Sequence, residues 1–427
     1  MSVRVENKCI SVGIDLCRDY SQMTYCMGNM REPESVSVIP GEQKYLIPTI
    51  VGKTEAQWCI GDDALLREKN GEAVITGDIL VTLLTEKKIK LLDEEYNGHQ
   101  LLKVYFEGLF ELLKNNYHIT APDKVMVTVE YPDRILVNEI REIFVEMGYG
   151  RDDVKVIGHS ESLIYYTIFQ KRELWVNDVM VFDFTDNQFM VRRLATMRAR
   201  TPQPIVVEEI DLSSKIKAEN LLTEQGRVNT DLEFLEIAKE YCGKHIVSTV
   251  YLTGSGFYEK WMEKSLDYLC SKRRVFQGAN LFVKGAGYGN LSLMGLGNAA
   301  EYQFVCSGRT LVNIELMIEK DDKNVPVVLS KAGTNWYEAG ARAEGILDDA
   351  REIKLIISSS LSKKSEELVI DLRGFPPRPN KTTRIEIVLA YKNDSQCVVV
   401  VRDLGFGDFF KSSGEKVRTV IEIEDYL

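Results

Sequence analysis

The chain has 427 residues, of which 44% are hydrophobic and 27% charged, a composition typical of a globular protein with two or three domains. Its formal net charge of −11 argues against a nucleic-acid partner, because binding to phosphates requires a basic protein face. The sequence contains neither a run of about eighteen apolar residues nor an apolar leader, so we expect no membrane partner and no secretion.

The cysteines and histidines bear on location and on metal binding. Eight cysteines are scattered along the chain without any Cys-x-x-Cys pair. Together with the lack of a leader, this predicts reduced thiols and a cytoplasmic location. Only four histidines occur, and the sequence has no close His/Cys cluster, so a zinc site is not expected.

The first part of the chain is predicted to begin with a β-hairpin. Residues 8–27 read as two strands around a turn at Cys17–Tyr20, and further strands are expected in SVSVIP and YLIPTIVG, before the short element WCIGDDAL. From Asn97 onward, the apolar residues of LLKVYFEGLFELLKNN recur at three- and four-residue spacing, which predicts a helix.

The middle of the chain alternates between strands and helices and then repeats the hairpin. The buried strand KVMVTVEYP precedes a helix with Asp133 as its N-cap, and VKVIGHSESLIYYTIFQ reads as strand, turn and helix. VMVFDFTDNQFMVRRL then has the order of the first hairpin: strand, Asp, polar turn, strand. This internal repeat predicts two similar lobes.

The last part of the sequence changes from a mixed to a β pattern. Residues 198–226 look irregular, and they precede a helix at Thr230–Cys242, the strand STVYLTGSG and the helix FYEKWMEKSLDYLCSK. Beyond about Phe304, short β-branched strands and polar turns predict an antiparallel β-sandwich with one helix-like stretch, ARAEGILDDAREI. We therefore expect two lobes and a sandwich, at residues 1–175, 176–305 and 306–427.

Three turns contain the candidate ligand-binding residues: VGIDLCRDYS, VFDFTDNQF and VYLTGSGFYEKW. An Asp at the end of a hairpin strand can hold hydrated magnesium, and the N–H groups of the turn can bind phosphate. In TGSGF, glycine lets backbone approach a ligand closely, and a helix N-terminus favours negative charge. Taken singly, each Asp is better explained as capping its own turn, so the inference depends on all three turns.

In their order along the chain, these motifs resemble the actin-like ATPase superfamily, and most of all its seventy-kilodalton heat-shock chaperones. VGIDLCRDYS and VMVFDFTDNQF stand at the family's two phosphate hairpins, and TGSGF with QGANLFVKGAGYG resembles its adenosine motif. IDLRGFPPRPNKTTRIEIVLAYKNDSQCVVVVRDL is similar to its peptide-holding β-sandwich. The resemblance covers nearly the whole chain and implies a two-lobed, actin-like (ribonuclease H-like) α/β fold followed by a C-terminal antiparallel β-sandwich.

The resemblance further implies a cofactor, ATP or ADP with magnesium. Asp15 and Asp183 would face the metal from opposite lobes and, with Glu161, take part in catalysis. The catalytic-side glutamate of the family aligns with either Ser160 or Glu161. The neighbouring His159 reads either as a base or, more simply, as a hydrogen-bonding residue of a turn.

For the nucleotide itself, the resemblance implies four binding residues. Arg18 and Thr185 would donate to phosphate, whereas Gly254 and Gly256 would lie against adenosine.

The sequence departs from the family at both phosphate hairpins. Cys17, Arg18 and Asp19 stand where the family has Gly-Thr-Thr, and residues 185–188 replace its glycines and threonine. Asp19 adds negative charge near the phosphates, which Arg18 offsets in part. Because the loss of glycine amides removes preorganised donors, we expect ATP hydrolysis to be weak or absent.

The expected function is that of a heat-shock-chaperone-like protein whose nucleotide-type cleft is coupled to a β-sandwich that binds a polypeptide segment. The alternative is a non-enzymatic pseudo-ATPase scaffold that binds partner proteins or self-assembles. The sequence does not determine whether the chain forms oligomers. Trp336, at the start of the sandwich, is expected to pack inside it rather than to contact a partner.

Overall fold

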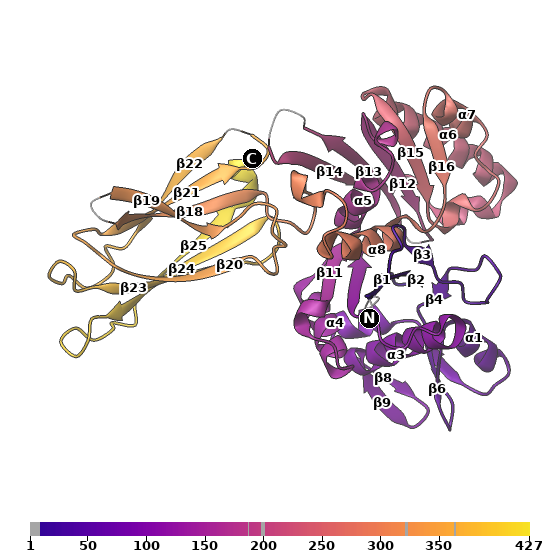
Figure 1. The fold of residues 1–427 in the computed structure, drawn as a ribbon, viewed down its shortest axis with the longest axis horizontal. Coiled ribbons are helices and arrows are strands. Elements are labelled where there is room, and N and C mark those ends of the chain that lie inside the picture. Colours follow the sequence, from indigo (N-terminus) through magenta and orange to yellow (C-terminus); the bar gives the residue numbers. More distant parts are fainter. Residues whose placement is uncertain (1–8, 187, 198–200, 321–322, 363) are drawn as a thin grey trace, which may run out of the picture. The chain divides into compact units, whose positions relative to one another are not determined.

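The computed structural model describes residues 9–186, 188–197, 201–320, 323–362 and 364–427 (Figure 1). The chain forms two compact units. The first comprises Met1–Thr196 and Val207–Glu301, and the second comprises Met197–Val206 and Tyr302–Leu427. The expected lobes at 1–175 and 176–305 therefore both lie largely in the first unit.

The first sheet of the first unit mixes parallel and antiparallel pairs. Its strand order is β11-β10-β1-β2-β3, with β4 also paired to β2. Strands β1 and β2 form an antiparallel hairpin, whereas β1–β10 and β10–β11 are parallel. The strands are β1 (Ile10–Leu16), β2 (Tyr20–Met27), β3 (Glu34–Ser35), β4 (Ile47–Pro48), β10 (Lys124–Val129) and β11 (Val154–Gly158).

The second sheet repeats this arrangement. Its order begins β16-β15-β12-β13-β14, with an antiparallel β12–β13 hairpin and parallel β12–β15 and β15–β16 pairs. Each sheet thus has a hairpin whose first strand is followed outward by two parallel strands. The strand–Asp–turn–strand pattern that is repeated in the sequence corresponds to this shared topology. The strands are β12 (Asp178–Phe184), β13 (Phe189–Thr196), β14 (Gln203–Asp211), β15 (Val247–Thr253) and β16 (Arg274–Gln277).

Eight helices are described, and small antiparallel sheets accompany them. Asp133 caps α4 as expected, because its side chain accepts hydrogen bonds from the N–H groups of Ile135 and Leu136. Asn97 forms a capping box with Gln100 at the start of α3. The helices are α1 (Gly61–Lys69), α2 (Ile79–Leu84), α3 (Gly98–Tyr117), α4 (Arg134–Glu146), α5 (His159–Ile168), α6 (Glu224–Gly243), α7 (Lys264–Cys270) and α8 (Leu281–Leu293). The remaining short strands are β5 (Val51–Lys53), β6 (Trp58–Ile60), β7 (Val74–Thr76), β8 (Lys88–Leu91) and β9 (Glu94–Asn97).

Helix α8 follows β16 of the second sheet in sequence but packs against the first sheet, where it contacts β1, β2 and β10, and against α5 (Figure 1). Glycines on both elements allow this close approach: a Cβ on Gly13 of β1 would lie 2.7 Å from the backbone nitrogen of Gly287, and a Cβ on Gly289 of α8 would lie 2.4 Å from Sδ of Met126. Asn290 also donates to the carbonyl of Val12 over 2.9 Å. This packing places the N-terminal residues of α8 beside the hairpin of β1 and β2.

The second unit contains two antiparallel four-stranded sheets, ordered β19-β18-β21-β22 and β20-β23-β24-β25. One core cluster includes residues of both sheets, among them Ile314, Leu355, Ile387 and Val399, so the arrangement is sandwich-like. The strands are β18 (Val312–Lys320), β19 (Lys323–Ser330), β20 (Gly340–Ile346), β21 (Glu352–Ser359), β22 (Ser365–Asp371), β23 (Arg384–Tyr391), β24 (Gln396–Gly405) and β25 (Lys416–Glu422). Strand β17 (Tyr302–Val305) pairs in parallel with residues 203–206 of β14.

Four expectations about secondary structure were wrong or held only in part. Of SVSVIP only Ser35 lies in a strand, β3, and of the helix expected at residues 257–272 only Lys264–Cys270 forms one, α7. The helix-like stretch at residues 341–353 forms most of β20 and the start of β21. Exposed and half-buried residues alternate along β20, and cross-strand pairing to β23 outweighs the local helix propensity of Ala and Glu. Residues 198–226, expected to be irregular, include the long strand β14.

Trp336 is 1% exposed and belongs to the core of the second unit, as expected. In the part of the chain that the structure describes, no helix is long and apolar enough to span a membrane.

Candidate functional site

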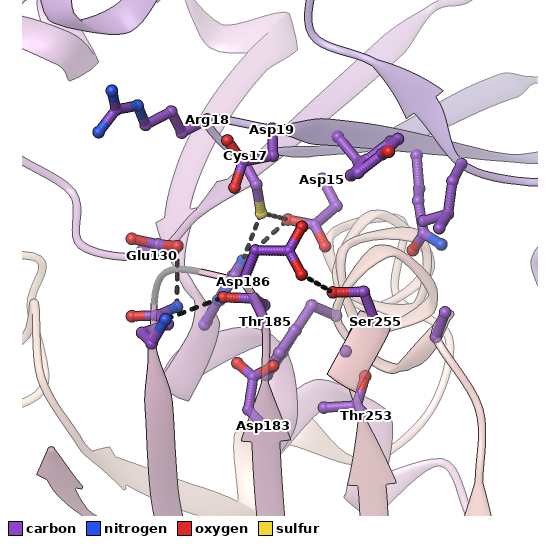
Figure 2. A pocket seen from close by; sticks show the side chains of 18 of the residues that line it. Asp15, Cys17, Arg18, Asp19, Glu130, Asp183, Thr185, Asp186, Thr253 and Ser255 are labelled. Atoms are coloured by element: carbon purple, nitrogen blue, oxygen red, sulfur yellow. Dashed lines mark hydrogen bonds and ion pairs between the residues drawn. The ribbon is translucent and has the colours of Figure 1, made fainter. Parts of the chain in front are cut away.

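A cavity of about 260 Å³ lies in the first unit where the two hairpins meet (Figure 2). Its lining comes from the β1–β2 turn, the β12–β13 turn, the end of β15 and the first residue of α5. Phe282 of α8 also lines it. Because β1, β12 and β15 all end here, side chains distant in sequence meet at one point. This is the arrangement in which ligands bind at the carboxyl ends of strands.

On the side of the first sheet, Asp15, Cys17 and His159 form one cluster. Asp15 is 6% exposed, and its Oδ1 lies 2.8 Å from Nε2 of His159. The thiol of Cys17 lies 3.5 Å from the same carboxylate oxygen and 3.8 Å from the same ring nitrogen. Thr49 holds the turn by donating from its hydroxyl to the carbonyl of Cys17 over 2.8 Å.

The ring of His159 is fixed by stacking. It lies parallel to the ring of Phe282, with 4.0 Å between centroids and 4° between planes. Burial alone would lower the pKa of His159, but the carboxylate of Asp15 outweighs this effect and the pKa is raised. The Asp15–His159 contact is therefore a buried hydrogen bond with ion-pair character.

On the side of the second sheet, Asp183 has a cationic partner. Arg192 of β13, 2% exposed, donates from Nη1 to Oδ2 of Asp183 over 3.0 Å and from Nε to Glu209 over 2.7 Å. Its guanidinium also lies over the ring of Phe282, 5.1 Å from the centroid. The negative charge of Asp183 is thus already balanced inside the protein.

The cavity is acidic. Its lining includes the carboxylates Asp15, Asp19, Glu130, Asp183 and Asp186. Burial and the nearby Asp183 raise the pKa of Glu130 above its ordinary value, and His159 opposes this shift. The pKa of the Cys17 thiol is raised well above its usual range by burial and by Asp15. The site therefore favours a cation over a further anion.

The structure brings together five of the seven residues proposed from the resemblance, and these five line the cavity: Asp15, Arg18, Asp183, Thr185 and Gly254. Arg18 extends away from Asp15 and Cys17 in Figure 2 and makes an exposed contact of 3.5 Å with Asp78. Thr185 closes its own turn, because its N–H donates to the carbonyl of Gln188 over 2.9 Å. Asn187 of this turn lies outside the described residues.

The other two proposed residues, Glu161 and Gly256, are absent from the described lining of the cavity. Glu161 is 2% exposed within α5, and the first residue of that helix, His159, lines the cavity instead. A Cβ on Gly256 would lie 2.4 Å from the ring of Phe184, so this glycine is required for packing against that ring. Gly254 has a φ of 95°, and a Cβ there would meet the Phe184 carbonyl at 2.1 Å.

Sequence reasoning missed Arg192 and Glu130 and left the role of His159 open. Arg192 stands in VFDFTDNQFMVRRL, where two adjacent arginines on a strand of buried residues were a signal that one of them points inward. Glu130 directly follows β10, at the same sheet edge as Asp15. No local pattern marks His159, because its partners are far away in sequence.

The residues at the site fit a magnesium–nucleotide complex poorly. Magnesium requires carboxylate and water oxygens, yet Asp15 and Asp183 each already direct an oxygen to a buried nitrogen partner. The amide of Thr185 is used within its turn, and three further carboxylates would oppose a triphosphate.

Fold and site define a two-part protein: a mixed α/β unit with a cavity between two β-hairpins, and an antiparallel unit. The chain belongs to the family of unknown function DUF5716, whose C-terminal model matches residues 32–307. A domain of unknown function, DUF8552, matches residues 309–423. The comparison with curated proteins gave no match. The boundary between the two matched regions lies close to Tyr302, where the longer segment of the second compact unit begins.

Proposed function

We propose that this chain is an actin-like protein organised like a seventy-kilodalton heat-shock chaperone, in which the cleft between the lobes has little or no ATPase activity and the antiparallel unit binds a protein segment. Support for the actin-like assignment comes from the repeated strand order of the two sheets and from the cavity where their hairpins meet. Support for the chaperone-like organisation comes from the sandwich-like unit that follows.

One observation supports weak or absent hydrolysis above all others: Arg192 pairs with Asp183 inside the protein. In a magnesium-dependent site, the cation is what balances the strand-end carboxylates and the phosphate oxygens. Here the guanidinium supplies that charge permanently. An ion pair of two side chains 2% and 5% exposed is costly to break, because either charge left alone would be buried without a partner.

A second candidate function, a pseudo-ATPase scaffold that binds no nucleotide, is favoured by the acidity of the cavity. Each additional like-charge contact with phosphate costs on the order of 1 kcal/mol or more at an intermediate dielectric. Five carboxylates line the site, and the cation Arg18 is drawn outward to Asp78. The two candidates share the fold and differ in whether nucleotide binds at all.

Thermal unfolding of the full chain with Mg-ATP or Mg-ADP separates the two candidates. Nucleotide at 100 times its Kd adds about 2.7 kcal/mol to the free energy of unfolding, which raises Tm measurably. A shift with a negligible rate of phosphate release supports the chaperone-like proposal. If millimolar nucleotide causes no shift in Tm, the scaffold is the supported candidate. Turnover of nucleotide at rates of about 1 per second or faster, typical of enzymes, would contradict both candidate functions.

Asp186→Asn provides the matched test of the electrostatic argument. Asp186 lines the cavity and contacts Ser255 at 3.3 Å, so removal of its charge should tighten nucleotide binding about fivefold, as about 1 kcal/mol predicts. Asp93→Asn, at a fully exposed residue remote from the cavity, should have no effect. Equal affinities in the two variants would remove like-charge repulsion as the reason for weak binding.

Binding of a protein segment is proposed for the groove between the two sheets of the second unit. Its lining includes Leu316, Ile318, Ile346, Leu347 and Ile353. The sequence favoured instead the loops before Pro326 and around residues 334–337, and the second of these is less suitable because Trp336 is buried there. Extended peptides are held by backbone hydrogen bonds and apolar pockets, and weak complexes dissociate fast.

A titration of the full chain with a fluorescent apolar peptide tests this location. We expect rapidly reversible binding with a Kd in the micromolar range or weaker. Ile346→Glu places a charge in the groove and should abolish binding, whereas Val369→Glu, at a similarly exposed residue outside the groove, should not. Absence of saturable binding to the wild-type chain would leave the unit as a structural or docking module.

A further inference from the structure

We propose that Asp15, Cys17 and His159 form a binding site for a divalent transition metal ion of the zinc type. This inference goes beyond the proposed function, because it requires neither nucleotide nor a protein partner. It also reverses the expectation, drawn from the spacing of His and Cys along the chain, that a zinc site is absent.

The separations of the three donor atoms are within about half an ångström of those of ligands on one tetrahedral ion. Bonds of about 2.3 Å to sulfur and about 2.0–2.2 Å to nitrogen and oxygen place tetrahedral ligand atoms roughly 3.3–3.6 Å apart. The observed separations are 3.8 Å for Cys17 Sγ to His159 Nε2, 3.5 Å for Cys17 Sγ to Asp15 Oδ1, and 2.8 Å for His159 Nε2 to Asp15 Oδ1. Shifts of about half an ångström bring all three to an ion.

The direction of the contacts favours a metal site over a catalytic Cys-His-Asp relay. In a relay, the carboxylate holds one ring nitrogen and the nucleophile faces the other. Here Asp15 and Cys17 both face Nε2 of His159. Among the described residues, the buried Nδ1 of this histidine has no hydrogen-bond partner. Convergence of three donors on one point is the geometry that a metal ion requires.

The chemistry of the donors selects the class of metal. Magnesium and calcium prefer oxygen ligands, whereas a set of thiolate, imidazole and carboxylate is typical of zinc and its neighbours. The ion would take the place of the proton that now links Nε2 to Asp15 and of the proton of the Cys17 thiol, and both protons would be released to solvent. Its charge would also offset the acidic lining of the cavity.

The position of the cluster implies an open coordination site. All three residues line the cavity, so a fourth ligand would come from water or from a bound small molecule. Three protein ligands with an open position distinguish zinc sites that bind or activate a ligand from closed structural sites. An anion that is poorly accommodated by the acidic cavity alone could bind directly to such an ion.

Cobalt(II) titration of the chelator-treated full chain tests the proposal without nucleotide, so failure of nucleotide binding would not affect the result. We expect one cobalt ion per chain, an absorption band from thiolate-to-cobalt charge transfer, and displacement of cobalt by zinc. Cys17→Ser should abolish the band, and His159→Gln should weaken binding at least about tenfold, since even outer-shell changes cost that much. Cys270→Ser and His99→Gln, which change an exposed cysteine and a remote histidine, are the matched controls.

A band that persists in Cys17→Ser would overturn the proposal, as would the absence of cobalt binding. So would a band that disappears instead in Cys242→Ser, which changes the cysteine nearest to His245 in sequence. If the variants fail to fold, alkylation of the wild-type chain decides. Zinc should slow modification of Cys17 at least about tenfold but leave Cys270 unchanged. Equal rates at Cys17 with and without zinc would refute the site.

Discussion

Arg192 donates from Nη1 to Oδ2 of Asp183 over 3.0 Å, and the two side chains are 2% and 5% exposed. Asp183 ends β12 and Arg192 lies on the neighbouring strand β13, so the hairpin itself brings them together. Glu209 of β14 accepts a second bond from the same guanidinium over 2.7 Å. This ion pair occupies the side of the cavity where the resemblance placed magnesium.

Arg192→Met should destabilise the first unit by about 3–5 kcal/mol, because it leaves Asp183 buried without its partner. The double variant Arg192→Met with Asp183→Asn should recover part of that loss, since both buried charges are then removed. Urea unfolding measures both values. Arg193→Met is the control: its contacts with Glu208 and Asp178 are more exposed, so a cost of about 1 kcal/mol is expected. Equal costs at the two arginines would contradict the argument.

The stability of the second unit should depend on pH through the carboxyl group of Asp403. Both of its oxygens accept from Arg378, over 2.6 and 2.7 Å, and its side chain is fully buried. Burial by itself raises the pKa of this carboxyl, but Arg378, Ser413 and backbone N–H groups lower it far below its ordinary value. The resulting stabilisation is complete above the unfolded pKa of about 3.9 and is lost as pH falls through the folded pKa.

Asp403→Asn should therefore cost about 3–5 kcal/mol at neutral pH, and the difference from wild type should shrink below about pH 4. Denaturant unfolding at a series of pH values gives the measurement. Asp371→Asn, which breaks an exposed pair with Arg373, should change stability by less than about 1 kcal/mol at every pH. A difference that is independent of pH would show that packing, not charge, makes Asp403 important.

Gly256→Ala should lower the stability of the first unit by about 1–3 kcal/mol, because its methyl group would overlap the buried ring of Phe184. Gly278→Ala is the matched control, since a Cβ there meets nothing within 4 Å. Thermal unfolding without ligand compares the two. Unchanged stability together with lost adenosine binding would restore the ligand-contacting role that the resemblance implied for Gly256.

Trp336→Ala should cost about 3–5 kcal/mol, because it removes a large side chain from the core of the second unit. Phe409→Ala provides the contrast of an aromatic residue that is 95% exposed, and its effect should lie within about 0.5 kcal/mol. The measurement is denaturant unfolding of the full chain. A neutral Trp336→Ala would mean that this indole serves a partner rather than the fold.

The sequence by itself determined the elements and their repetition. Alternating apolar residues and a polar turn after Asp15 and after Asp183 predicted the two hairpins, and Asp133 predicted the start of α4. The change of pattern near Phe304 predicted the antiparallel unit. These features depend on local periodicity and capping, which neighbouring residues decide. Local pattern failed at residues 341–353, where pairing with β23 makes a strand from residues of high helix propensity.

Only the tertiary structure decided what the cavity contains. Cys17 and His159 stand far apart in the sequence, so no spacing rule connects them, yet the parallel pairing of β1 with β10 and of β10 with β11 brings both to one sheet edge. The same holds for Phe282, which reaches His159 because α8 packs against the first sheet. Whether a strand-end Asp faces a ligand or a buried arginine depends on cross-strand neighbours and on burial, and these arise only when the sheets assemble.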